Sequence, residues 1–166
     1  MGQPSGSFSR DANRVPIWTD GIITKRTITF AGATEHAWGD DGGDLDGGVV
    51  FTVTGIVKCQ LIGDVTTDLV GGATIEVGIT GATAIFCKKV TDTTIDEGDI
   101  YLNEVATDYY VIGEEQASAD DLPTYLLNGQ DIILTTTTTN TTSGVIDFYC
   151  IWVPYSDDGD VVATTT

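Results

Sequence analysis

The longest alternation of apolar and polar side chains lies at residues 49–62 and limits the fold more than any other feature. The apolar positions Val49, Phe51, Val53, Val57, Cys59 and Leu61 alternate with Thr52, Thr54, Lys58 and Gln60. Successive side chains of a strand point to opposite faces, so a period of two predicts a long strand with one buried face. Gly55 interrupts the pattern and predicts a bulge.

Similar but shorter patterns predict further strands at residues 21–31, 73–79 and 83–90, and two short pieces at Ile100–Leu102 and Tyr109–Ile112. Residues 130–139 and 144–155 are predicted to form a hairpin around a polar connector. One helical turn is expected at residues 114–122, ended by Pro123. Short strands with frequent turn signals indicate an all-β fold, either a β-sandwich or a β-barrel of short antiparallel strands.

The chain divides into an extended N-terminal arm, residues 1–20, and a single β domain, residues 21–166. The arm has no apolar periodicity, yet it carries large apolar and basic side chains that a solvated tail generally lacks. These are Phe8, Arg10, Arg14, Ile17 and Trp18. Either the arm docks on a partner, or Ile17 and Trp18 enter the first strand of the domain.

The formal charge is −18, from 25 acidic and 7 basic residues. Such a surface repels phosphate, so neither nucleic acid nor an anionic membrane is expected as a partner. The longest apolar runs are too short to span a bilayer, and no signal-peptide pattern is present at the start. The three cysteines, Cys59, Cys87 and Cys150, show no metal-binding spacing and no even pairing, so they are expected to be free.

No catalytic motif accompanies the single histidine, His36. A structural or surface role is expected for this residue, no cofactor is predicted, and the chain is predicted not to be an enzyme. A glycosidase would use paired carboxylates. With 25 acids in the chain, some pair always lies close, so that pattern is uninformative.

Asp40, Asp41, Asp44 and Asp46 cluster in a Gly-rich stretch predicted to be a loop at residues 39–48. Clustered carboxylates on a flexible loop are typical of Ca²⁺ sites, and this loop is a weak candidate for one. A solvated turn explains the same composition without an ion, and no metal site is predicted. Asp157, Asp158 and Asp160 form a second acidic turn.

The strand at residues 144–155 is apolar on both faces, which indicates a central strand or a subunit interface. Ile146, Phe148, Cys150 and Trp152 share one face, and Tyr149 lies on the other. Ile146, Phe148, Tyr149 and Trp152 are the candidate interface residues.

Two stretches carry a family resemblance. One runs from Phe51-Thr-Val-Thr-Gly-Ile-Val-Lys-Cys to Thr67-Asp-Leu-Val-Gly-Gly-Ala-Thr-Ile-Glu-Val-Gly-Ile-Thr-Gly, and the other from Gly129-Gln-Asp-Ile-Ile-Leu-Thr to Gly144-Val-Ile-Asp-Phe-Tyr-Cys-Ile-Trp-Val-Pro-Tyr. Over residues 49–160 the chain resembles capsid decoration (cement) proteins of tailed bacteriophages, whose genes commonly neighbour the major capsid gene. The resemblance implies a β-sandwich or barrel that binds the outer capsid lattice, often as a trimer, and implies no catalytic residues.

Composition and resemblance together predict a structural virion protein, made in the host cytoplasm, that binds the outer capsid surface and stabilises the shell. Its expected partners are the major capsid protein and itself, as a homotrimer. The alternative is a virion-surface adhesin or a carbohydrate-binding head fibre module, with exposed tyrosines and acidic Ca²⁺ loops carrying recognition.

Overall fold

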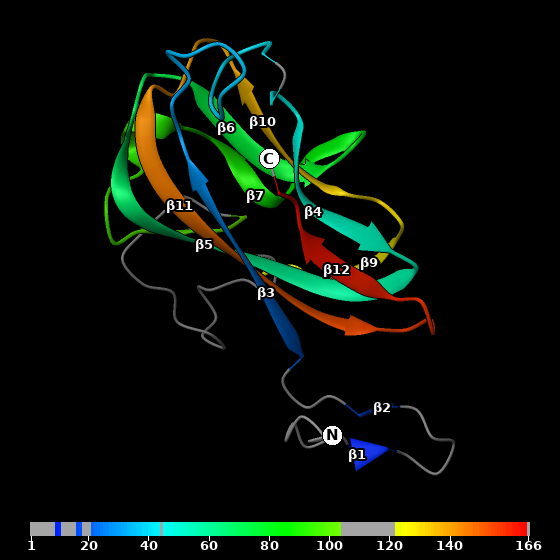
Figure 1. Cartoon of the computed structure of the whole chain (residues 1–166). Helices are drawn as coiled ribbons and strands as arrows, with labels where there is room; N and C mark the ends of the chain where they lie inside the picture. The colour runs from blue at the N-terminus through cyan, green and yellow to red at the C-terminus, as the bar shows by residue number, and fades with distance from the viewer. Residues whose placement is uncertain (1–8, 11–15, 18–20, 44, 104–121, 166) are drawn as a thin grey trace.

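The computed structural model describes residues 9–10, 16–17, 21–43, 45–103 and 122–165. Within these ranges two antiparallel sheets pack face to face as a β-sandwich (Figure 1), which confirms the predicted all-β fold. The described strands are β1 (Ser9–Arg10), β2 (Pro16–Ile17), β3 (Ile22–Thr29), β4 (Gly48–Thr54), β5 (Ile56–Val70), β6 (Thr74–Ile79), β7 (Ala82–Thr91), β8 (Ile100–Tyr101), β9 (Tyr125–Asn128), β10 (Ile132–Thr137), β11 (Ser143–Pro154) and β12 (Asp160–Ala163).

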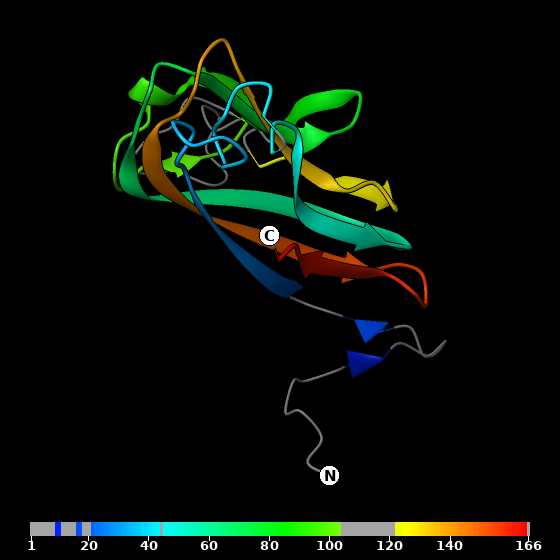
Figure 2. The ribbon, with the colours of Figure 1, turned by 45° about the horizontal axis from the view of Figure 1, so that its top comes forward.

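One sheet has the strand order β12-β4-β10-β6-β7 and the other has the order β3-β11-β5-β8, with β9 also paired to β5. We call the second sheet the β11 sheet. Its two longest strands, β5 and β11, run side by side along the body of the molecule (Figure 2). Among the described residues, β1 and β2 pair with each other and with no strand of the two large sheets.

The alternation of apolar and polar side chains along the strands produces the core. Inward-facing side chains of both sheets form one apolar cluster, which includes Phe51, Val57, Leu61, Phe86 and Phe148, all at most 1% exposed. Ile28 and Phe30 lie in this core on one face, as their spacing predicts. Apolar area removed from water contributes about 25 cal/mol per Å², so these inward rows stabilise the sandwich.

The alternation at residues 49–62 is divided between the two sheets, which corrects the prediction of one long strand. Gly55 has φ +60° and joins β4 of one sheet to β5 of the other. A Cβ at this position would lie 2.5 Å from both Ser156 Oγ and Asp158 Oδ1. Gly55 is therefore a corner rather than a bulge, because only glycine adopts this φ easily and leaves room for the neighbouring turn.

The predicted hairpin of residues 130–139 and 144–155 is also wrong, because β10 and β11 belong to different sheets. The connector crosses from one sheet to the other, and Thr138 within it has φ +85°. Two strands of the sandwich were missed, β9 and β12, each only four residues long. The predicted piece at Tyr109–Ile112 and the helical turn at 114–122 lie outside the described residues, apart from Leu122.

A buried carboxylate joins three turns at one end of the sandwich. Asp92, 0% exposed, accepts a hydrogen bond from the Gly72 amide at 2.7 Å and another from the Thr141 hydroxyl at 2.8 Å. Its own amide donates to the Ala73 carbonyl. Buried polar groups need such partners, so Asp92 holds the turns around residues 72, 92 and 141 together.

A second polar chain connects the sheets along one side. The Trp152 indole donates to the Thr24 hydroxyl at 3.0 Å, and that hydroxyl donates to the Val161 carbonyl at 3.0 Å. β3 and β12, the edge strands of the two sheets, are joined there. The outer faces of the two sheets are the broad surfaces of the domain.

Candidate interaction surface

The outer face of the β11 sheet carries a mostly apolar patch. We call this surface the Tyr149 face and define it by Ile23, Lys25, Lys58, Gln60, Ile62, Leu126, Tyr149, Ile151 and Val153. Ile23 is 62% exposed and Leu126 is 65% exposed. Exposed apolar patches that span several strands are typical of protein interaction sites.

Strand pairing shows that these nine residues are neighbours across four strands. Along β11, Tyr149 stands between Lys25 and Ile62, and Ile151 stands between Ile23 and Gln60. Val153 pairs with Lys58, which pairs in turn with Leu126 of β9. Residues two apart on a strand share a face, so the three rows adjoin one another.

The charge of the Tyr149 face differs from that of the whole chain. None of its nine residues is acidic and two, Lys25 and Lys58, are basic, but Asp147 and Asp64 lie beside them on the same outer face. An apolar centre with an aromatic residue is typical of the core of a protein interface. The face is therefore suited to contact with protein.

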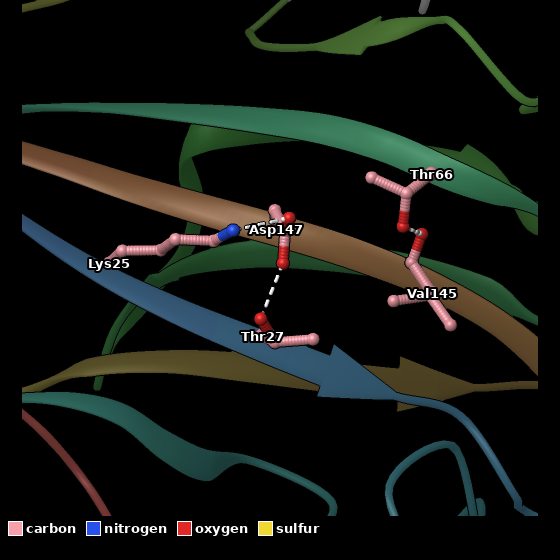
Figure 3. A network of polar contacts seen from close by, with 5 residues as sticks. All are labelled: Lys25, Thr27, Thr66, Val145 and Asp147. Atoms are coloured by element: carbon pink, nitrogen blue, oxygen red, sulfur yellow. Dashed lines mark hydrogen bonds and ion pairs between the residues drawn. The ribbon is translucent and has the colours of Figure 1, made fainter.

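Lys25 connects the Tyr149 face to a polar network at its border (Figure 3). Its Nζ lies 2.6 Å from Asp147 Oδ2 and 5.3 Å from the centre of the Tyr149 ring. Thr27 donates a second hydrogen bond to Asp147, and Thr66 donates one to the Val145 carbonyl at 3.4 Å. The lysine is thus held over the tyrosine by ion pairing and by cation–π attraction.

The same network shifts two pKa values. The hydrogen bond to Asp147 raises the pKa of Lys25 and outweighs the opposing effect of burial. Partial burial raises the pKa of Asp147, but the hydrogen bonds from Lys25 and Thr27 and the lysine charge outweigh it and place that pKa below its ordinary value. Both groups therefore stay charged at neutral pH.

The outer face of the other sheet is polar by contrast. Threonines predominate there, from Thr52 and Thr54 on β4 to Thr135 and Thr137 on β10. Thr74 on β6 and Thr137 share a hydroxyl hydrogen bond of 2.6 Å. A hydroxyl-lined sheet face is compatible with water, so the two broad surfaces of the sandwich are chemically distinct.

Three of the predicted interface residues lie in the core, which corrects their assignment. Ile146 and Phe148 are 0% exposed and Trp152 is 5% exposed, because their side chains point between the two sheets of a single chain. Only Tyr149, on the opposite face of the same strand, reaches the surface. The strand itself is central, between β3 and β5, as its two apolar faces indicate.

The predicted docking arm falls mostly outside the described residues. Phe8, Arg14 and Trp18 are not described. Arg10 ends β1 and Ile17 ends β2, the two strands of the small separate sheet. The docking role of the arm stays a prediction.

The acidic loop makes structural contacts. The Asp46 carboxylate accepts the Thr136 amide, and the Asp41 amide donates to the Asn140 side chain, each at 3.0 Å. Among the described residues no group of three or more His, Cys, Asp or Glu side chains is arranged to hold a metal ion. Asp40 belongs to the described part of the loop and Asp44 does not, so the weak Ca²⁺ candidate formed by the four aspartates stays a prediction.

His36 lies in an exposed turn at φ +66°, with Nε2 3.7 Å from the exposed Glu35 carboxylate. Cys59, Cys87 and Cys150 are free and buried. Burial raises the pKa of the Cys87 thiol, and a hydrogen bond with Cys59 together with burial raises that of Cys150. Raised thiol pKa values disfavour nucleophilic use of these two cysteines.

Sequence reasoning found part of the Tyr149 face. The alternation placed Lys58 and Gln60 opposite one buried row, and Tyr149, Ile151 and Val153 opposite another. Ile23, Ile62 and Leu126 join them only through the pairing of strands far apart in the chain.

Comparison with protein families, with curated protein sequences and with solved structures finds no match for this chain. The described residues contain no helix long and apolar enough to cross a membrane. The fold defines the chain as an antiparallel β-sandwich whose β11 sheet has a mostly apolar patch on its outer face.

Proposed function

We propose that this chain is a structural virion protein that binds the outer surface of a phage capsid and stabilises the shell. The observation that carries the proposal is the Tyr149 face, a mostly apolar patch with exposed Ile23 and Leu126 on a chain of net charge −18. A rigid sandwich with such a face is built for contact with protein. The resemblance of residues 49–160 to capsid decoration proteins supports the capsid as the partner.

The charge supports a place on the outside of a DNA-filled shell. A surface with 25 acids and 7 bases is repelled by packaged DNA and remains soluble at high copy number. Two of the seven bases, Arg10 and Arg14, belong to the arm, together with Phe8, Ile17 and Trp18. Under this proposal the arm binds the capsid and the sandwich covers the shell.

Repetition strengthens weak contacts on such a shell. Each copy bridging neighbouring capsid subunits makes its second contact at high effective concentration. Modest contacts, multiplied by the symmetry of the lattice, then resist expansion of the shell.

The test measures binding to capsids assembled from the major capsid protein encoded nearest to this chain. Cosedimentation is compared for the wild type, for a chain lacking residues 1–20, and for a full-length chain with Phe8, Ile17 and Trp18 changed to Ser. Aromatic anchors contribute about 2 kcal/mol or more each, so both variants are expected to bind at least roughly thirtyfold more weakly. Lys89→Glu, an exposed change on β7, is the control expected to bind normally.

Wild-type chain that remains in the supernatant at every capsid concentration would overturn the proposed function. Unchanged binding of both arm variants would remove the arm from the mechanism. Circular dichroism of each variant establishes that the sandwich is folded.

A further inference from the structure

Exposed apolar side chains gather on one face of the sandwich. Six large apolar side chains are exposed among the residues that the structure describes, and four of them lie on the outer face of the β11 sheet. These four are Ile23, Ile56, Leu126 and Tyr155. Alternation puts Ile56 on the same side of β5 as Lys58, and Tyr155 on the same side as Val153 of β11. The Tyr149 face therefore continues to the end of the sheet where β5 begins and β11 ends.

The N-terminal arm leaves the domain beside this surface. Ile22 pairs with Trp152, and a Cβ on the preceding residue, Gly21, would lie 3.0 Å from Ile151 Cγ2. Ile151 belongs to the Tyr149 face. The three strand spacings from β3 to β9 cover roughly 15 Å, since adjacent strands are about 4.8 Å apart. Residues 1–20 are long enough to cross the face, because an extended chain covers about 3.3 Å per residue.

The arm has apolar side chains to place on this surface. Its strands β1 and β2 pair Ser9 with Ile17, and Phe8 and Trp18 are the neighbouring residues in the sequence. Removal of apolar area from water on both sides of a contact favours it, against the cost of ordering the arm. A tether within the same chain reduces that cost, because it holds the arm beside the face at high effective concentration.

Charge also favours the arm as the occupant of this surface. The arm carries two of the seven bases, Arg10 and Arg14, and only two of the 25 acids. The turn that directly follows Tyr155 has three exposed carboxylates, those of Asp157, Asp158 and Asp160. Arginines that approach this border of the apolar surface meet opposite charge, which favours the contact and orients it.

We propose that in the free chain the N-terminal arm folds back on its own domain and covers the outer face of the β11 sheet around Leu126 and Tyr155. The inference goes beyond the proposed function and does not depend on it, because the contact lies within one chain. A docked arm lowers the apparent affinity of the arm for any other partner in proportion to the fraction of chains whose arm is free. The contact is therefore a device that restrains the arm until a partner competes for it.

Trypsin cleavage of the full chain measures whether the arm is docked, because Arg10 and Arg14 both lie in the arm. Cleavage of a segment that opens and closes rapidly follows the population of its open form. A docked arm is therefore cut more slowly than an arm that has lost its binding surface.

Two double variants with an unchanged arm are compared. The face variant combines Leu126→Ser with Tyr155→Ser, and the matched control combines Val70→Ser with Val162→Ser. All four side chains are exposed, so both variants are expected to fold, which circular dichroism verifies. Val162 belongs to β12 of the other sheet, and Val70 ends β5 at the opposite end from Ile56.

The arm of the face variant is expected to be cut roughly tenfold faster than that of the wild type, and the arm of the control at the wild-type rate. Asp157→Lys is expected to accelerate cleavage about threefold by removing an attractive charge. Asp96→Lys makes the same change in the turn before β8 and is expected to have no effect.

Tryptophan fluorescence gives a second measurement. Trp38 and Trp152 are 6% and 5% exposed, so quenching by acrylamide reports mainly on Trp18. Stronger quenching is expected in the face variant than in the wild type or the control.

A mixture distinguishes docking within one chain from exchange between copies. The arm variant, in which Phe8, Ile17 and Trp18 are changed to Ser, keeps an intact face. When it is mixed with the face variant, the arm of the face variant is expected to be cut as fast as before. Protection in the mixture would put the arm on a second copy and overturn the inference.

Equal cleavage of the wild type and the face variant, or equal acceleration by the face variant and the control, would overturn it as well. Cosedimentation with capsids separates this inference from the proposed function. A wild type with a free arm that binds capsids refutes the docked arm alone, whereas a docked chain that never binds capsids refutes the proposed function alone.

Discussion

Replacing Asp92 tests how much one buried carboxylate contributes to this sandwich. Asp92→Ala removes the acceptor of the Gly72 amide and of the Thr141 hydroxyl, and both Asp92 and Thr141 are 0% exposed. A hydrogen bond to a charged group contributes about 1.5–3 kcal/mol, so the expected loss in the free energy of unfolding is about 3–5 kcal/mol. For a chain of 166 residues this lowers Tm by roughly 10 °C.

Asp92→Asn separates hydrogen bonding from charge. The asparagine Oδ1 still accepts the Gly72 amide, and the Thr141 hydroxyl can rotate to accept from the new Nδ2 group. The expected loss is only about 1 kcal/mol. Asp96→Ala, an exposed change on the same turn, is the control and is expected within about 0.5 kcal/mol of the wild type.

The assay is urea unfolding followed by circular dichroism, with a thermal scan in parallel. Equal losses for Asp92→Asn and Asp92→Ala would refute the reasoning, because the charge and not the hydrogen bonds would then matter. An Asp92→Ala chain as stable as Asp96→Ala would refute it as well.

Three further predictions concern the connector, the Lys25 network and β11. Thr138→Gly is expected to raise the free energy of unfolding by about 1 kcal/mol in urea unfolding, because a β-branched residue is strained at φ +85°; a loss would contradict this. The pKa of Asp147 is lower in the folded chain than its ordinary value of about 3.9, so its ionised carboxylate stabilises the fold at pH values above about 3.9. This stability is lost as the pH falls through the folded pKa. Asp147→Asn should therefore flatten the acid side of a stability–pH curve, and an unchanged slope would exclude this group. Phe148→Ala is expected to cost about 3–5 kcal/mol because its side chain lies in the core, whereas Tyr149→Ser should cost about 1 kcal/mol. Denaturation of both variants compares them, and equal losses would contradict the two-faced description of β11.

Much of the fold was predictable from local patterns. The rows that include Phe51, Leu61 and Phe148 are buried as their alternation indicates, and the all-β class follows from the same signal. Short elements were missed, since the four residues of β9 and of β12 carry too little alternation to distinguish a strand from a loop.

The candidate surface was less accessible to sequence reasoning. Period two separates Phe148 from Tyr149 but does not say which face is covered by a second sheet. That choice depends on which strands pack opposite β11, and the structure assigns Phe148 to the core and Tyr149 to the surface. Leu126 and Ile23 join Tyr149 through strand pairs separated by more than twenty residues of chain.

The sequence by itself determined the β class, the buried and exposed rows of most strands, and the strong negative charge, because each is a property of composition or of neighbouring residues. Only the tertiary structure decided that Gly55 is a corner between sheets, that β10 and β11 do not form a hairpin, and that a lysine-bearing apolar face exists. Alternation is the same whether a strand pairs with its neighbour in sequence or crosses to the opposite sheet, so pairing is decided by how the whole chain buries its apolar rows.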